Sequence, residues 1–248
     1  MKLSFVVPAY NEEAYISECL DCILLHAEGR IHEVIVVDNA STDRTSELAQ
    51  SRAGVRIIHE PKRGVTFARQ CGLQHVTGEL LAYVDADCRI SPNWIEIVEK
   101  SFGPDSDLVS LSGPYRYYDG PKISRWFLDA IGWSVLPVGF RLFRYMLVGG
   151  NFIVRKRALL EAGGFSENID FFGEDTDLGR RLHARGKTQF RTDFFVWSSG
   201  RRFYAQGLVR ANLIYFTNFC WMILFHRPFS KSHHDIREQF PVSRLLSY

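Results

Sequence analysis

Residues 80–87 read Leu80-Leu81-Ala82-Tyr83-Val84-Asp85-Ala86-Asp87. The first five are apolar on consecutive positions, and this pattern predicts a strand that is covered on both faces, as in a parallel sheet. Two carboxylates follow directly, at Asp85 and Asp87. Because ligands of open parallel sheets bind beyond the carboxyl ends of the strands, we expect this strand to end at a ligand site.

Three similar apolar runs lie earlier in the chain, and stretches with helical spacing separate them. The runs cover 3–7, 33–37 and 55–58, and the helical stretches cover 12–26, 43–52, 65–75 and 92–102. Strands that alternate with helices predict an α/β fold with a mostly parallel central sheet flanked by helices. Polar or aromatic residues follow each run, so they should converge on the sheet edge that carries Asp85.

The second half of the chain is less regular. We expect strands at 108–112 and 152–154, and helices over 124–147, 156–162, 173–185 and 203–225. Since the longest of these stretches are rich in Phe, Trp and Tyr, the C-terminal part is predicted to be helical and aromatic-rich. The sequence shows no repeat and no linker, so we expect a single domain over 1–248.

The composition excludes several classes of protein. The chain has 248 residues, of which 46% are hydrophobic and 23% charged, which suffices for a large core without disulfides. Its formal net charge of +2 is too balanced for a protein that binds nucleic acid through a basic face. Five scattered cysteines favour a reducing compartment.

The first residues do not match a signal peptide. Pro8 and Glu12 close the apolar stretch 3–7 far too soon, and no apolar run reaches the roughly 18–20 residues needed to cross a bilayer. We therefore expect a cytoplasmic protein, at most peripheral at the inner face of the membrane.

The pair Asp85 and Asp87 suits a hard cation. Two carboxylates one residue apart can hold Mg²⁺ or Mn²⁺ and leave its other positions to water and phosphate oxygens. The alternative is that Asp87 only caps the turn ahead of Ser91. The chain has neither a G-x-G-x-x-G turn after the first strand nor a G-x-x-x-x-G-K-[ST] loop. A diphosphate would therefore be held by a metal and basic side chains.

Five motifs follow one another along the chain: VPAYNE at 7–12, VVDNASTDRT at 36–45, RQCG at 69–72, DAD at 85–87 and GEDTDL at 173–178. Their order resembles that of family 2 glycosyltransferases of the GT-A fold, over residues 3–200. The resemblance implies a Rossmann-like sheet and an enzyme that transfers a sugar from a nucleotide diphosphate sugar with inversion at the anomeric carbon. It divides the chain into a donor-binding half at 1–113, an acceptor-binding half at 114–225 and a basic tail at 226–248.

The resemblance also implies which residues bind the nucleotide. Asp38 is similar to the carboxylate that hydrogen-bonds the base, and Arg69 resembles a basic residue near the base and phosphates. UDP is favoured as the nucleotide, although Asp38 could bind guanine as well as uracil. The wall of the nucleoside pocket corresponds to Pro8, Ala9, Tyr10 and Glu12.

The same resemblance implies a role for each residue of the D-x-D triplet. Asp87 matches the family's principal metal ligand. Asp85 matches a residue that meets the ribose or a metal-bound water, with Ala86 between the two in the donor site. Many members carry a histidine near the end of the domain as a further metal ligand, but the corresponding run here, 196–199, reads VWSS.

Asp175 resembles the general base of the family, and the helical pattern around it agrees. On a helix it shares a face with Leu178 and Leu182, so it should point into the cleft. The first turn of a helix favours an ionised carboxylate by ~0.3–1 kcal/mol. Glu174 is the rival base, and both acids could instead only stabilise the start of the helix.

Two further groups complete the expected site. Gly149-Gly150-Asn151 is similar to an acceptor-side turn in which glycine lets the backbone approach a sugar closely, or it is a simple turn before a strand. Arg201 and Arg202 could neutralise the departing diphosphate, or they are a solvated basic pair. The Q-x-x-R-W motif of processive members is missing, which favours transfer of a single sugar.

Two aromatic-rich stretches, 126–147 and 213–225, carry arginine or lysine near their ends. Runs of this length are usually core helices, and the alternative is peripheral attachment at a bilayer interface. The expected partners are a nucleotide diphosphate sugar and a carbohydrate or lipid-linked acceptor, in the synthesis of a cell-envelope glycan. The alternatives are a sugar-nucleotide nucleotidyltransferase, whose glycine-rich loop is missing after the first strand, and a non-catalytic nucleotide- or carbohydrate-binding module.

Overall fold

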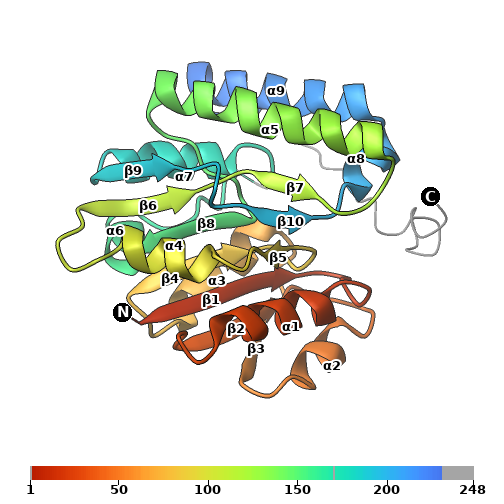
Figure 1. The fold of residues 1–248 in the computed structure, drawn as a ribbon, viewed down its shortest axis with the longest axis vertical. Coiled ribbons are helices and arrows are strands. Elements are labelled where there is room, and N and C mark those ends of the chain that lie inside the picture. The colour runs from red at the N-terminus through yellow and green to blue at the C-terminus, as the bar shows by residue number, and fades with distance from the viewer. Residues whose placement is uncertain (1, 170, 231–248) are drawn as a thin grey trace.

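The computed structural model describes residues 2–169 and 171–230, and the fold in Figure 1 is built from them. Its strands are β1 (Leu3–Ala9), β2 (Glu33–Asp38), β3 (Val55–His59), β4 (Leu80–Val84), β5 (Arg89–Ile90), β6 (Leu108–Ser112), β7 (Tyr115–Tyr117), β8 (Asn151–Arg155), β9 (Lys187–Phe190) and β10 (Val196–Ser198). Its helices are α1 (Ile16–Ala27), α2 (Thr45–Gln50), α3 (Val65–His75), α4 (Trp94–Ser101), α5 (Lys122–Phe143), α6 (Lys156–Glu161), α7 (Glu174–His183), α8 (Arg201–Gln206) and α9 (Leu208–Phe225).

Seven strands form the central sheet in the order β3-β2-β1-β4-β8-β6-β9. All neighbouring strands run parallel except at β8, which is antiparallel to both β4 and β6. Helices cover both faces, so the predicted α/β fold with a mostly parallel sheet is confirmed. The register pairs Val84 with Asn151 and thereby sets the turn before β8 beside the end of β4.

A second, three-stranded sheet has the order β5-β10-β7. Its strands and β9 were not predicted, because strands of two to four residues carry too little periodicity to be recognised in a sequence. This small sheet continues directly from the ends of β4 and β6. It therefore forms a wall above the carboxyl edge of the central sheet, where the sequence predicts a ligand site.

The core divides into two layers because alternate residues of a strand face opposite sides of a sheet. Phe5 and Val7 pack with α1 and α4 in one layer, and Val6 packs with α3 and α7 in the other. Trp94 is completely buried between Phe5 and Phe194, with ring centroids 5.3 and 4.6 Å apart. Both faces of the sheet are thus dry, as the continuous apolar runs predict.

The C-terminal part is helical and aromatic-rich, as predicted, but two details differ. The single helix expected over 203–225 is two helices, because Gly207 between them has a φ of 84° that a helix cannot continue through. The other concerns α9, which among the described residues is long and apolar enough by length and composition to cross a membrane, although it contains no unbroken apolar run of 18–20 residues. Most of the basic tail expected at 226–248 lies outside the described residues.

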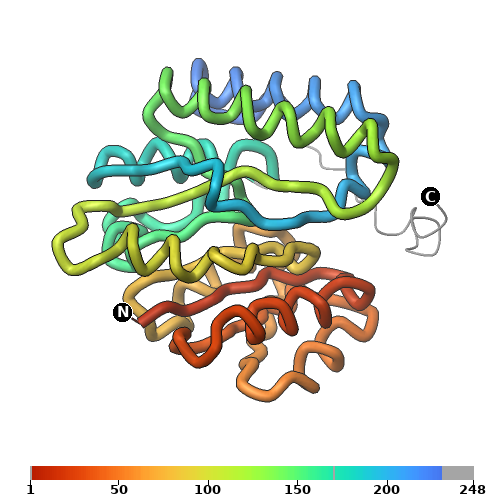
Figure 2. Tube along the Cα trace, in the orientation of Figure 1, coloured from red at the N-terminus to blue at the C-terminus, as the bar shows by residue number. Residues whose placement is uncertain are grey.

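The tube in Figure 2 shows α5 and α9 side by side along one end of the molecule, opposite the end that carries α1 and α2. Phe143 of α5 contacts Phe219 of α9, with ring centroids 5.9 Å apart. We call these two helices the α5–α9 layer. Its outer face is not core: only Leu128 and Gly132 of α5 are buried, and 17% of α9 is buried. The core interpretation of the two aromatic stretches is therefore wrong for this face.

Candidate active site

The chain emerging from β4 brings Asp85 to Arg69, a buried residue of α3. Arg69 Nη2 donates to Asp85 Oδ1 at 3.1 Å, and Arg69 Nη1 donates to Glu174 Oε1 at 2.8 Å. Burial alone would lower the pKa of Arg69, but the charges of Asp85 and Glu174 outweigh it and raise that pKa. One permanently charged side chain therefore joins the D-x-D triplet to the first turn of α7.

The glycine turn before β8 closes over this ion-pair bridge. A Cβ atom on Gly150 would overlap the carboxylate of Asp85, and one on Gly149 would lie 3.0 Å from Arg69 Nη2. The backbone N–H of Gly150 donates to the hydroxyl of Tyr115 at 2.7 Å, and that hydroxyl donates to Asp85 Oδ2 at 3.4 Å. Burial raises the pKa of Tyr115 well above its usual value, so the hydroxyl keeps its proton. The turn needs glycine because it lies directly against these side chains.

A second arginine holds the other carboxylate of the triplet. Arg201, at the start of α8, places Nη2 3.2 Å from Asp87 Oδ2 and donates to both carboxylate oxygens of Glu12 at 2.6 and 2.7 Å. Its guanidinium also lies 4.5 Å from the ring centroid of Tyr15. Glu12 is 3% exposed, so this contact neutralises a buried charge. The structure thus brings the segments that follow β1 and β4 together with the start of α8.

The acidic pair Glu174 and Asp175 opens α7 directly after Gly173. Burial raises the pKa of both carboxyls above their usual values, and the charge of Asp175 raises that of Glu174 further. Glu174 is held by Arg69, whereas Asp175 accepts from the backbone N–H and the hydroxyl of Thr176 at 2.7 and 3.3 Å. Both of these bonds go to Oδ1. The two acids titrate as a coupled pair.

The carboxylates of Asp85 and Asp87 offer hard oxygen donors, which suit Mg²⁺ or Mn²⁺. Within residues 2–169 and 171–230, no cluster of three or more His, Cys, Asp or Glu side chains could hold a metal. The two aspartates fit a cation that takes its remaining ligands from water and phosphate oxygens. Binding it would exchange the contact between Arg201 and Asp87 for a contact with the metal.

The predicted nucleoside residues lie at the ends of β1 and β2. Asp38 is buried, accepts from the backbone N–H of Ser41 at 3.2 Å, and lies 3.1 Å from the imidazole of His59. The guanidinium of Arg63 stacks on Tyr10, 4.1 Å from the ring centroid. Pro8 and Ala9 are the last residues of β1, whereas Glu12 of the predicted pocket wall points to Arg201. Ala86 is buried between the two aspartates.

The structure corrects the role expected for Asn151. Its side chain is completely buried, and its amide bonds the indole N–H of Trp94 at 3.0 Å and the carbonyl of Phe194 at 2.8 Å. It also donates to the carbonyl of Gly113 at 3.1 Å. Because no part of this amide faces the site, Asn151 cannot touch an acceptor. It ties β8 to the wall formed by the small sheet.

One predicted site residue lies away from its expected neighbour, and one residue of the site was not predicted. Arg202, expected beside Arg201, lies over the ring of Phe171 at 4.5 Å. Tyr115, which touches both Asp85 and Gly150, was missed. The available signal was the run Tyr115-Arg116-Tyr117-Tyr118 directly after a predicted strand, because aromatic residues at alternate positions are typical of strands.

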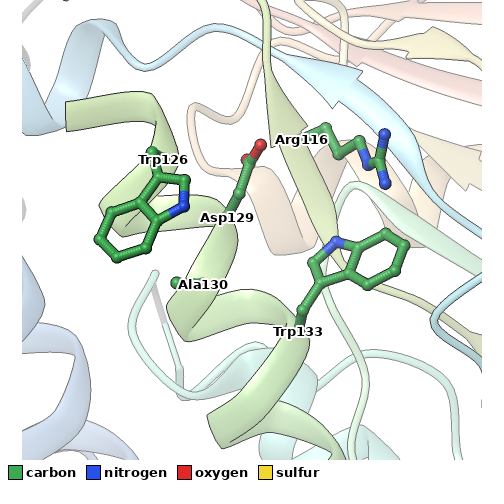
Figure 3. A pocket seen from close by; sticks show the side chains of 5 residues that line it. All are labelled: Arg116, Trp126, Asp129, Ala130 and Trp133. Carbon is green, nitrogen blue, oxygen red and sulfur yellow. The ribbon is translucent and has the colours of Figure 1, made fainter. Parts of the chain in front are cut away.

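The same strand also borders a pocket on its other side. Arg116 points away from Tyr115 and lines a pocket of about 160 Å³ with Trp126, Asp129, Ala130 and Trp133 of α5 (Figure 3). Its guanidinium lies over the rings of Trp133 and Phe195, at 4.4 and 4.5 Å. Since successive residues of a strand face opposite sides, this pocket is separate from the candidate active site.

Comparison with known proteins places the chain in a family. The model of glycosyl transferase family 2 matches residues 4–164. A dolichol-phosphate mannosyltransferase of Pyrococcus furiosus is 32% identical over 130 residues, which are 51% of this chain and 36% of that protein. The chain spans 36–41% of the length of the first curated relatives it matches.

Solved structures agree on the fold. A mannosyltransferase of Pyrobaculum calidifontis, in complex with GDP-Man and Mn²⁺, has a TM-score of 0.66 at 24% identity and covers 86% of this chain and 64% of its own. Glucosyl-3-phosphoglycerate synthase of Mycobacterium tuberculosis, in complex with Mn²⁺, UDP and phosphoglyceric acid, has a TM-score of 0.62 at 19% identity, over 90% and 77% of the two chains. Because the family model matches more than half of the sequence, the chain belongs to glycosyltransferase family 2.

Proposed function

We propose that the protein transfers one sugar from a nucleotide diphosphate sugar to an acceptor hydroxyl, with inversion at the anomeric carbon. The observation that carries the proposal is the bridge of Arg69 between Asp85 and Glu174. It joins the two groups on which the reaction would depend, the carboxylates at the donor phosphates and the acids at the acceptor. Distant parts of the sequence would not converge in this way if these acids only stabilised local turns.

The donor would bind over the ends of β1, β2 and β4. Asp38 is available to hydrogen-bond the base, and Tyr10 to flank it, with Pro8 and Ala9 beneath. UDP is the favoured nucleotide; the related solved structures hold either GDP-Man or UDP with Mn²⁺. Arg201 would turn from Asp87 toward the diphosphate, whereas Arg202, which lies over Phe171, would have to move to contact it.

Asp87 and Asp85 would hold the divalent cation, Mg²⁺ or Mn²⁺. When bound, such an ion neutralises negative charge on the departing diphosphate. Support comes from the oxygen-only donor pair and from the Mn²⁺ in two solved structures of similar fold. Arg69 stays beside Asp85 and keeps its carboxylate aligned.

Asp175 would act as the general base. The acceptor oxygen forms a bond to the anomeric carbon while the bond from that carbon to the diphosphate oxygen breaks, and the acceptor's proton passes to Asp175 Oδ2. The products are the glycosylated acceptor and the nucleoside diphosphate, so atoms and charges balance. Such a proton transfer typically contributes about 10²–10⁴ in rate. Glu174 is less suitable because its carboxylate is engaged by Arg69.

The acceptor would be a carbohydrate or a lipid-linked sugar of the cell envelope. It would approach the acidic pair beside the turn of Gly149 and Gly150, which lies directly against Asp85 and Arg69. Transfer of a single sugar is favoured over polymer synthesis because the motif of processive members is missing from the sequence.

Calorimetry with UDP-sugars and GDP-sugars, each with and without Mn²⁺, tests the proposal. We expect one donor class to bind only when Mn²⁺ is present and Asp87→Ala to abolish that binding. The matched control is Asp105→Ala, an exposed aspartate outside the site. Donor binding that survives Asp87→Ala unchanged would contradict the metal assignment. Donor binding without sugar transfer to any glycan acceptor would favour a binding module.

A further inference from the structure

Exposed apolar side chains are concentrated on the α5–α9 layer. Among the described residues, fourteen large hydrophobic side chains are exposed; six lie on α5, five on α9 and one just after it. The remaining two are Leu25 and Leu160. Soluble surfaces normally carry such residues singly, and a contiguous exposed patch marks an interaction surface.

The faces of α9 are sharply divided. Ala211, Asn218 and Met222 are buried along one side, whereas Leu213 and Phe216 on the opposite side are each 59% exposed. The Asn218 side chain accepts from the backbone N–H of Ser230 at 2.9 Å. This helix is thus anchored to the protein by its inner side, and its outer side has no cover among the described residues.

The α5–α9 layer carries mostly positive charge, although the whole chain is nearly neutral. Asp129 is the one acidic residue of α5, and α9 has none. Five exposed basic residues stand at the ends of the two helices: Lys122, Arg141, Arg144, Arg210 and Arg227. An apolar face with basic residues at its borders is complementary to a bilayer with anionic headgroups, because the cations can stay in the headgroup region.

We propose that the outer faces of α5 and α9 dock on an anionic lipid bilayer, with both helices lying in its interface. A span by α9 is disfavoured because it would remove Met222 from its contact with Gly173, at the start of α7. Trp126, 71% exposed on α5, has the amphipathic ring typical of membrane interfaces.

Docking would bring the candidate active site close to the lipid headgroups. Met222 of α9 packs against Gly173, the residue that begins α7, so only the width of α9 separates the acidic pair from the outer face. Tyr215 of α9 lies 5.6 Å from Phe172, ring centroid to ring centroid. A lipid-linked acceptor would thus be presented beside Asp175. This last step rests on the proposed transferase function, whereas the docking itself does not.

Vesicle flotation tests the docking. We expect the wild-type protein to float with vesicles of phosphatidylcholine containing phosphatidylglycerol, and to do so at least tenfold less with phosphatidylcholine alone or in high salt. Leu213→Glu combined with Phe216→Glu, and Trp126→Glu alone, should each reduce flotation at least tenfold. Leu25→Glu, a substitution at an equally exposed leucine on α1, should leave it unchanged. Vesicle binding lost equally in this control, or absent from the wild type, would overturn the proposal.

Two further measurements separate the outcomes. Sedimentation velocity without lipid should show a monomer; a dimer that the α9 double variant dissociates would assign the face to a second copy and overturn the lipid assignment. Donor binding, followed by thermal shift with UDP-sugars and GDP-sugars, should be the same in wild type and surface variants. Vesicle binding without donor binding would contradict the proposed function and leave the docking intact.

Discussion

Arg201 places its Nη2 atom 3.2 Å from Oδ2 of Asp87, and the same nitrogen contacts both carboxylate oxygens of Glu12. The contact joins the end of β4 to the start of α8, which are far apart in the sequence. The guanidinium therefore occupies the neighbourhood in which the proposed cation would sit. It balances two carboxylates as long as no metal and no diphosphate are bound.

Removal of Arg201 should destabilise the fold. In Arg201→Ala, Glu12 keeps a buried charge without its main partner, a situation that typically costs about 3–5 kcal/mol. Arg44→Ala is the matched control because its pair with Glu47 is exposed and such pairs contribute little to stability. Urea denaturation at neutral pH measures the free energy of unfolding of both variants. Equal losses of unfolding free energy in the two variants would contradict the larger contribution expected of the buried pair.

Asp175→Asn should retain donor binding and lose transfer by about 10²–10⁴, because an amide cannot accept the acceptor's proton. Single-turnover assays measure transfer, and calorimetry measures donor binding on the same preparation. Glu174→Gln is the comparison: it removes a charge from Arg69 and should affect donor binding more than Asp175→Asn does. Full activity of Asp175→Asn would remove the base assignment.

The rate of transfer should depend on the ionisation of the acidic pair. Burial raises the pKa of both Glu174 and Asp175, so their protons leave at higher pH than those of exposed carboxyls. A protonated base is inactive, and the rate should therefore rise with pH up to the apparent pKa of the pair and then level off. We expect a pH profile of kcat whose acidic limb lies above the usual carboxyl range and disappears in Asp175→Asn. An acidic limb at the pH range in which an exposed carboxyl titrates would contradict this prediction.

Gly150→Ala should impair donor binding more than folding. The added methyl group would overlap the Asp85 carboxylate and the Tyr115 hydroxyl, and must push them away from their present positions. Gly103→Ala is the matched control because a Cβ atom there meets nothing within 4 Å. Titration with the donor that wild type binds, in the presence of Mn²⁺, should show weaker binding in Gly150→Ala and unchanged binding in the control.

Much of the fold was predictable because the relevant signals are local. Consecutive apolar runs located β4 and β6 to the residue, and the expected helix over 65–75 matches α3. The short strands β5, β7 and β10 were not predictable because they are held by partners distant in the sequence. Likewise, the break at Gly207 depends on a backbone conformation that an apolar pattern does not reveal.

In the candidate site, too, some features have local sequence signals and others depend on residues distant in the sequence. Acidic motifs drew attention to Asp85, Asp87 and the start of α7, because charged residues at strand and helix ends are visible in a sequence. The pairing of each acid with a particular arginine depends on the tertiary fold, and so does the burial of Asn151. An asparagine after two glycines looks like part of a turn; only the structure shows that its amide holds the indole of Trp94.

The antiparallel strand β8 has a consequence for how such a chain can diversify. It joins β4 to β6 and β9 in one continuous sheet, so the glycine turn before β8 is held in fixed register beside the end of β4. The α5–α9 layer lies outside this sheet, along one end of the molecule. Evolution could therefore exchange this outer cover, and change where in the cell the protein works, without rebuilding the chemistry underneath.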